Sequence, residues 1–168
     1  MKHVAYRDEH AIAKVVEKFE RCAFGLEEFT HARHLTVASW YLCHLPPDEA
    51  QARMSTGLVR FIEHHGKQGY HETITRFWME LIRTFLDCLP KNASIMEKVN
   101  KTMELHGNKD VLLKYYTRER VLSEVAGRTR LKVDWVRSPI SANLRRDSCE
   151  LPPSGPFLSH GPTDVFAF

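Results

Sequence analysis

Apolar residues recur every three to four positions through most of the first 106 residues, which is the period of an amphipathic α-helix. The clearest example runs from Tyr70 to Pro90, where Ile74, Trp78 and Phe85 share one face and charged residues occupy the other. Capping residues, glycines and prolines divide the pattern into five predicted helices. Their expected ranges are 8–25, 30–46, 48–66, 70–90 and 94–106.

Short polar side chains and helix breakers set these boundaries. Asp8, Thr30 and Asp48 are predicted N-caps, because their side-chain oxygens accept hydrogen bonds from the unpaired N–H groups of a first helical turn. Gly25 is the expected stop of the first helix, and Pro46 ends the second. With Thr30 as the N-cap, His31 lies in the first turn of the second helix.

The last third of the chain has a different pattern. Two short helices, about 110–116 and 117–127, are expected to close over the bundle, and residues 130–136 are a weak strand candidate. Five prolines among the last 31 residues exclude regular helix there. We therefore expect an all-α fold, an up-down bundle of four to five main helices. One domain would span residues 1–137, followed by an extended or disordered Pro-rich arm over residues 138–168.

Composition narrows the class of protein. The 168 residues, 43% of them hydrophobic, are enough for one domain with a real core. No apolar run approaches the ~20 residues of a membrane span, and the chain turns acidic at Asp8 where an export signal would need a hydrophobic stretch. A cytoplasmic protein without membrane contact is expected. The four cysteines form no CxxC pair, which argues against a zinc ribbon or a dense disulfide framework.

Histidines fall where an up-down topology would bring helix ends together. Helices joined by short loops pack antiparallel to their sequence neighbours, so the second and fourth helices should run parallel. Their N-termini would then meet the C-termini of the third and fifth helices at one pole of the bundle. The histidines at these ends are His31, His34, His65, His71 and His106.

Three of these histidines are predicted to face inward. His31 and His34 lie within the apolar arc of the second helix, and His71 lies within that of the fourth, with Glu72 at its edge. A histidine pair spaced i,i+3 with a ligand from a neighbouring helix suits zinc, iron, manganese or nickel. A helix N-terminus disfavours the imidazolium, so the first-turn histidines should stay neutral and able to ligate.

The first functional hypothesis is therefore an enzyme acting on a small molecule. His31, His34 and His71 would bind a divalent metal, and Glu72, or alternatively Glu27 or Glu28, would be a further ligand or the general base. A related hypothesis keeps the pocket but omits the ion. In that case His71 and Glu72 would carry out acid-base catalysis.

A second hypothesis, of a different class, is a non-catalytic binding or assembly protein with structural histidines. Residues 114–146 carry nine basic and three acidic side chains, an excess that attracts anionic partners. Phenylalanines in the C-terminal arm would contact a partner or a second copy of the chain. Nucleic acid is not the expected partner, because the pattern predicts no exposed sheet or groove on which bases would stack.

Three segments resemble those of a group of small bacterial all-helical proteins of unassigned function. They are residues 29–35 (FTHARHL), 70–78 (YHETITRFW) and 112–116 (LLKYY). The resemblance covers about residues 25–140. It implies an all-helical fold and carries no activity, cofactor or catalytic residue.

Overall fold

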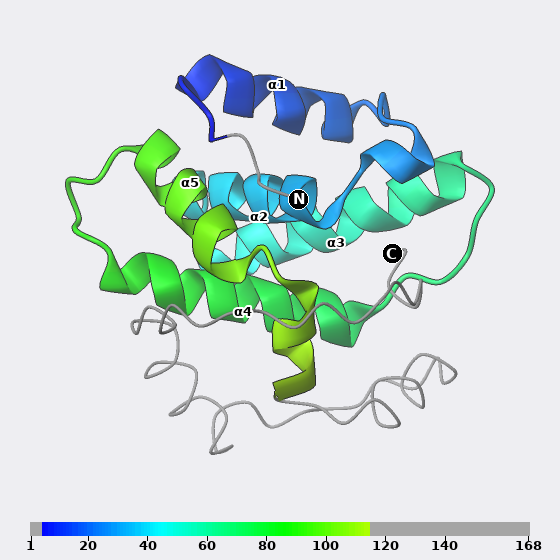
Figure 1. Cartoon of the computed structure of the whole chain (residues 1–168). Helices are drawn as coiled ribbons and strands as arrows, with labels where there is room; N and C mark the ends of the chain where they lie inside the picture. The colour runs from blue at the N-terminus through cyan, green and yellow to red at the C-terminus, as the bar shows by residue number, and fades with distance from the viewer. Residues whose placement is uncertain (1–4, 115–168) are drawn as a thin grey trace, which may run out of the picture.

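The computed structural model describes residues 5–114 (Figure 1). This part of the chain forms five α-helices and two short 3-10 helices and contains no β-strand, so the predicted all-α class is confirmed. The α-helices are α1 (Glu9–Glu20), α2 (His31–His44), α3 (Pro47–His64), α4 (Glu72–Cys88) and α5 (Ile95–His106), and the 3-10 helices are Leu26–Glu28 and Lys109–Lys114. None of the helices in residues 5–114 combines the length and the apolar character that crossing a membrane requires.

Several sequence predictions concern residues outside this range. The second short helix at 117–127, the strand candidate at 130–136 and the C-terminal arm lie outside the described residues. So does the basic region, apart from its first residue.

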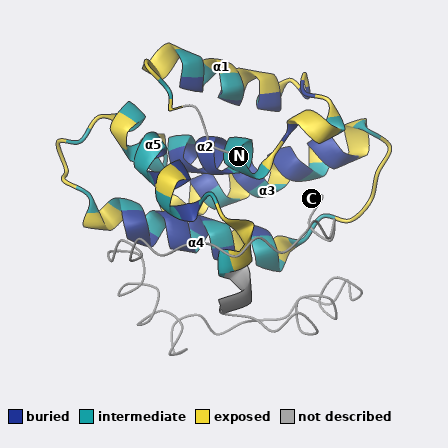
Figure 2. Ribbon diagram, viewed as in Figure 1, coloured by how far each residue is buried: buried dark blue, intermediate teal, exposed yellow. Residues whose placement is uncertain are grey.

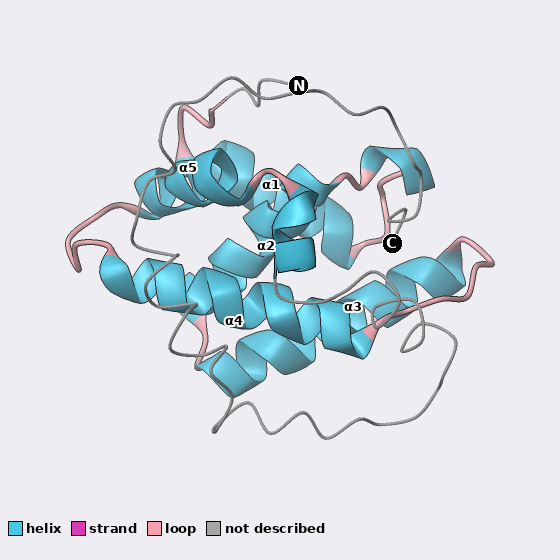
Figure 3. Ribbon diagram, turned by 60° about the horizontal axis from the view of Figure 1, so that its bottom comes forward, coloured by secondary structure: helices cyan, strands magenta, loops and turns pink. Residues whose placement is uncertain are grey.

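The helix α2 is the centre of the bundle. It packs against each of the other four helices (Figures 1 and 3). The chain direction alternates from α1 through α4, so α2 and α4 run parallel and begin at the same end of the molecule (Figure 1). This is the predicted up-down arrangement, with α5 crossing the bundle obliquely.

The central position of α2 follows from its composition. Residues 35–39 are buried without interruption, whereas a helix on the surface would bury one stripe only (Figure 2). The polar side chain of Thr36 is accommodated because its hydroxyl donates to the carbonyl oxygen of Ala32 at 2.9 Å. A helix with apolar or small side chains on all its faces is stable only when other helices surround it.

Aromatic rings fill the space between α1, α2 and α3. The ring of Phe29 stacks on Phe19 with a centroid separation of 4.7 Å and tilts against Phe61 at 5.0 Å. Gly57 on α3 permits this packing, because a Cβ atom at this position would lie 2.7 Å from the Phe19 ring. This region, which we call the aromatic cluster (Phe19, Phe29, Phe61), leaves no room for an additional methyl group.

The first helix ends earlier than its pattern predicts. It stops at Glu20, and Cys22, with φ of 51°, takes the left-handed conformation that the prediction assigned to Gly25. A guanidinium nitrogen of Arg60 donates to the backbone oxygen of Glu20 at 2.8 Å, which satisfies a carbonyl at the helix end. The predicted stop at Gly25 is therefore wrong, because a tertiary contact from α3 secures the earlier end.

The third helix begins one residue before its predicted cap. Pro46 is the N-cap and Pro47 is the first helical residue, a position at which proline fits because its missing N–H has no helical partner. Asp48 therefore lies within the first turn, and its prediction as the N-cap is wrong. Thr30 is the N-cap of α2 as predicted, although its side chain makes no capping hydrogen bond.

Candidate functional site

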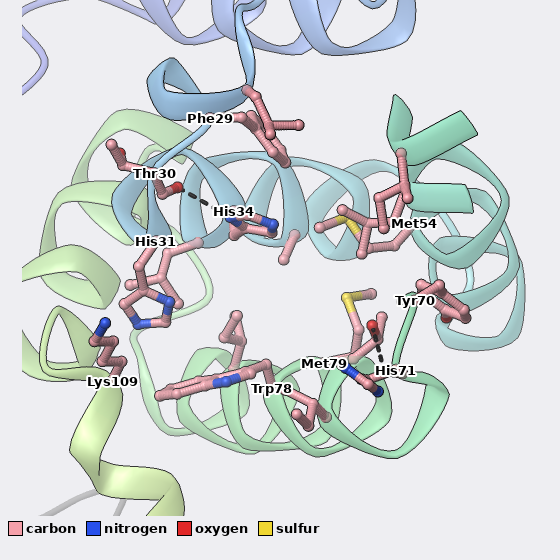
Figure 4. A pocket seen from close by; sticks show the side chains of 18 of the residues that line it. Phe29, Thr30, His31, His34, Met54, Tyr70, His71, Trp78, Met79 and Lys109 are labelled. Carbon is pink, nitrogen blue, oxygen red and sulfur yellow. Dashed lines mark hydrogen bonds between the residues drawn. The ribbon is translucent and has the colours of Figure 1, made fainter. Parts of the chain in front are cut away.

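A cavity of about 310 Å³ lies between α2, α3 and α4, beside the first turns of α2 and α4 (Figure 4). Its walls are mostly apolar and come from all three helices. Prominent among them are Leu35, Ala38, Met54, Leu58, Trp78 and Met79. The mostly apolar lining distinguishes this cavity from a shallower, more polar hollow beside Glu20, Arg53 and Arg60.

All three histidines predicted as metal ligands line the cavity, but on two different walls. His31 and His34 project from α2, whereas His71 lies across the cavity beside Tyr70 at the start of α4 (Figure 4). Within residues 5–114, no three His, Cys, Asp or Glu side chains are grouped so that they would hold a metal ion. The structure therefore joins the predicted residues in one cavity without arranging them as a ligand set.

His34 is held by its own helix. Its Nδ1 lies 3.0 Å from the carbonyl oxygen of Thr30, and its ring packs against Phe29 with centroids 4.1 Å apart. A carbonyl oxygen only accepts hydrogen bonds, so Nδ1 carries the proton of the neutral ring. The other nitrogen, Nε2, is then an acceptor, and Figure 4 shows the ring of His34 directed into the cavity.

Burial keeps His34 uncharged. Loss of solvation lowers the pKa of His34 to about 4, and the nearby His31 adds to this effect, while the hydrogen bond to Thr30 opposes it. Burial also lowers the pKa of His71. The sequence prediction that these histidines stay neutral agrees with these directions, although the leading cause is desolvation rather than the helix N-terminus.

His31 connects α2 to α4 and α5. Its Nε2 donates to the backbone oxygen of His106 at 3.1 Å, and its ring packs against Trp78 with centroids 4.6 Å apart. The side chain of His106 is buried against the edge of Phe85. Its Nε2 has no hydrogen-bond partner among the described residues, and burial lowers its pKa to about 4, with His31 contributing. His31 thus ties the start of α2 to the end of α5.

His65 shows that the local contact of His34 is not itself a site. Its Nδ1 donates to the Phe61 carbonyl at 2.9 Å and its ring packs on Phe61 at 4.5 Å, which matches the bonding of His34 to its own helix. However, His65 does not line the cavity. His65 lies at the end of α3 that the prediction places at this pole, but its side chain does not line the cavity with the other histidines.

The predicted carboxylates are placed less favourably. Glu72 is exposed, accepts a hydrogen bond from the Tyr70 hydroxyl and does not line the cavity. The Glu28 carboxylate accepts from the backbone N–H of Gly25 at 2.7 Å. Glu27 is exposed at the edge of the cavity. The geometry therefore places no buried carboxylate beside the histidines.

The apolar pattern did not predict that α3 forms part of the cavity wall. Met54, Leu58 and Ile62 supply one wall of the cavity, at the spacing i, i+4 and i+8 that aligns side chains along a helix. An apolar row of this kind predicts a buried helix face and does not distinguish a filled core from the wall of a cavity. Lys109, which lines the cavity near His31 and Trp78, gave no signal in the sequence (Figure 4).

No protein-family model, curated protein or solved structure matches this chain. Its chemistry must therefore be inferred from the cavity and the residues around it.

Proposed function

We propose that this protein binds a small, mostly apolar molecule in the cavity between α2, α3 and α4. The observation that carries the proposal is the cavity itself. Protein cores pack as densely as organic crystals, with few voids larger than a water molecule. A partly open apolar cavity of about 310 Å³ beside the aromatic cluster is large enough to take a small molecule and to remove its apolar surface from water.

The volume indicates the size of the ligand. An engineered apolar cavity of about 150 Å³ holds benzene, and small-molecule pockets begin at about 300 Å³. The cavity here has room for a substituted single ring or a fused pair of rings. Trp78 and Phe29 offer ring faces and edges to such a compound.

Of the hypotheses drawn from the sequence, the proposal keeps a small molecule bound beside His31, His34 and His71. It assigns these histidines to ligand recognition and includes no ion, because their placement on two walls provides no ligand set. The alternative of a partner bound through the basic region and the arm depends on residues beyond 114, and the cavity does not bear on it.

The proposal is tested with 1-aminonaphthalene, a neutral dye of two fused rings whose fluorescence changes in apolar surroundings, added to the full-length protein. We expect saturable binding of one dye per chain. The substitution Ala38→Leu should abolish it, because Ala38 lines the cavity and a larger side chain would fill the space. Ala52→Leu, at an exposed position of α3, is the matched control and should bind as the wild type does. Absence of dye binding, or equal binding by a folded Ala38→Leu protein, would overturn the proposal.

A further inference from the structure

We propose that the ligand is a phenol-type molecule whose hydroxyl group donates a hydrogen bond to Nε2 of His34. This inference rests on the proposed function, and it names the class of compound that the cavity selects.

The hydrogen bond between His34 and Thr30 decides which nitrogen of the His34 ring can accept a hydrogen bond from a ligand. Because Nδ1 of His34 donates to the Thr30 carbonyl, Nε2 has a lone pair and no proton. No described residue donates to this nitrogen, and the side chain faces the cavity (Figure 4). When a ligand displaces water from an apolar cavity, an acceptor that faces it is most stable if the ligand supplies a donor, so the complementary ligand brings one.

The His34 ring is fixed by its bond to Thr30 and by its packing on Phe29 in the first turn of a central, buried helix. Rotating the ring to present a donor would break the hydrogen bond to Thr30. The acceptor is therefore already oriented before any ligand arrives, which lowers the entropy lost on binding.

Charged groups of a ligand do not suit the position that faces Nε2 of His34. A carboxylate offers acceptors alone and would face the acceptor nitrogen of His34. An ammonium group would lose its hydration in an apolar cavity, where the carboxylate at the edge, Glu27, is exposed to solvent. A neutral hydroxyl avoids both penalties. An aromatic body completes the match, because Trp78 and Phe29 line the same space.

The test uses the full-length protein and two probes of nearly equal shape, 4-ethylphenol and 4-ethyltoluene, which replaces the hydroxyl with a methyl group. Affinity is measured by displacement of 1-aminonaphthalene and by calorimetry. The wild type should bind the phenol about tenfold more tightly, the effect of one paired buried hydrogen bond. In His34→Phe the preference should reverse toward 4-ethyltoluene, because the variant lacks the acceptor and the methyl compound is the more apolar.

His65→Phe is the matched control. His65 has the same backbone hydrogen bond and ring packing as His34 but lies outside the cavity, so this variant should keep the wild-type preference for the phenol. A second measurement does not depend on how His34→Phe folds. The ¹⁵N resonance of His34 Nε2 in the wild type should move upfield with 4-ethylphenol and not with 4-ethyltoluene.

The outcomes separate this inference from the proposed function. If both probes displace the dye equally and the Nε2 resonance does not respond, the assignment to His34 is overturned while the cavity remains a binding site. If neither the dye nor either probe binds, the proposed function fails and the inference fails with it.

Discussion

The side of α2 that faces α1 packs against closely fitted aromatic rings, whereas the side that faces α4 borders a cavity. Toward α1, the rings of the aromatic cluster interlock and Gly57 supplies the clearance that Phe19 needs. Toward α4, apolar side chains of α2, α3 and α4 enclose a cavity of about 310 Å³ with histidines at its border. Hydrophobicity alone does not distinguish the faces. They differ in whether side chains fill the space between the helices. The filled face stabilises the fold, and the face with the cavity is the proposed ligand site.

The largest effect should come from the filled face. Phe61→Ala is expected to lower the free energy of unfolding by about 3–5 kcal/mol, because the ring is fully buried and contacts the rest of the aromatic cluster. Urea denaturation monitored by circular dichroism measures the change. Thr56→Ala, at an exposed position of α3, is the control and should change stability little. A loss below about 1 kcal/mol for Phe61→Ala would show that this face is not closely packed.

Acidification should destabilise the protein through His34 of α2 and His106 of α5. The pKa values of His34 and His106 are lowered by burial to about 4, whereas the pKa of an unfolded histidine is about 6.5. Between these values the unfolded chain binds more protons, so stability is fully present above pH 6.5 and falls as the pH drops toward 4. We expect the free energy of unfolding to fall by several kcal/mol over this window, since each pKa unit corresponds to about 1.4 kcal/mol for each histidine.

The experiment that checks this pH dependence is chemical denaturation at several pH values. His106→Leu should flatten the dependence, because the variant removes one of the two buried histidines. His44→Gln, at an exposed position, should leave it unchanged. A pH dependence that is identical in His106→Leu and in the wild type would contradict the account of His106.

A single methyl group should distinguish the two faces. Gly57→Ala places a Cβ atom 2.7 Å from the buried Phe19 ring, so overpacking should destabilise the protein by about 1–2 kcal/mol despite the better helix propensity of alanine. Thermal unfolding measures the effect. If Gly57→Ala is more stable than the wild type, the filled face has room that the structure does not show.

The smallest effect on stability is expected at the hollow face. Ala38→Leu adds three carbon atoms at a buried position that lines the cavity, and it should change the free energy of unfolding by less than about 1 kcal/mol or raise it. The same denaturation assay applies. A loss equal to that of Gly57→Ala would mean that the two faces are packed alike.

Local sequence patterns predicted some of the structural features on which this comparison depends, but not all of them. Periodicity predicted α4 and its buried face, and the wheel position of His31 and His34 predicted that they turn inward. The end of α1 was misplaced because Arg60, far along the chain, satisfies a carbonyl at Glu20. A pattern of apolar positions does not report contacts between distant helices.

The cavity could not be predicted from the sequence pattern. A cavity depends on the positions of three helices and on the side-chain volume that they leave unfilled, so no single segment encodes it. The exposure of Glu72 was missed because the position lies at the edge of the apolar arc, where a small rotation decides between core and solvent. The bond of His34 to Thr30, in contrast, is local and was accessible once the first turn of α2 had been located.

The most direct test of the account is a crystal structure of the full-length protein grown with 4-ethylphenol. The account predicts the aromatic ring between α2 and α4, with the hydroxyl oxygen about 2.7–3.1 Å from Nε2 of His34. A structure in which Trp78 and Met79 close the cavity, with the phenol absent or bound elsewhere, would contradict it.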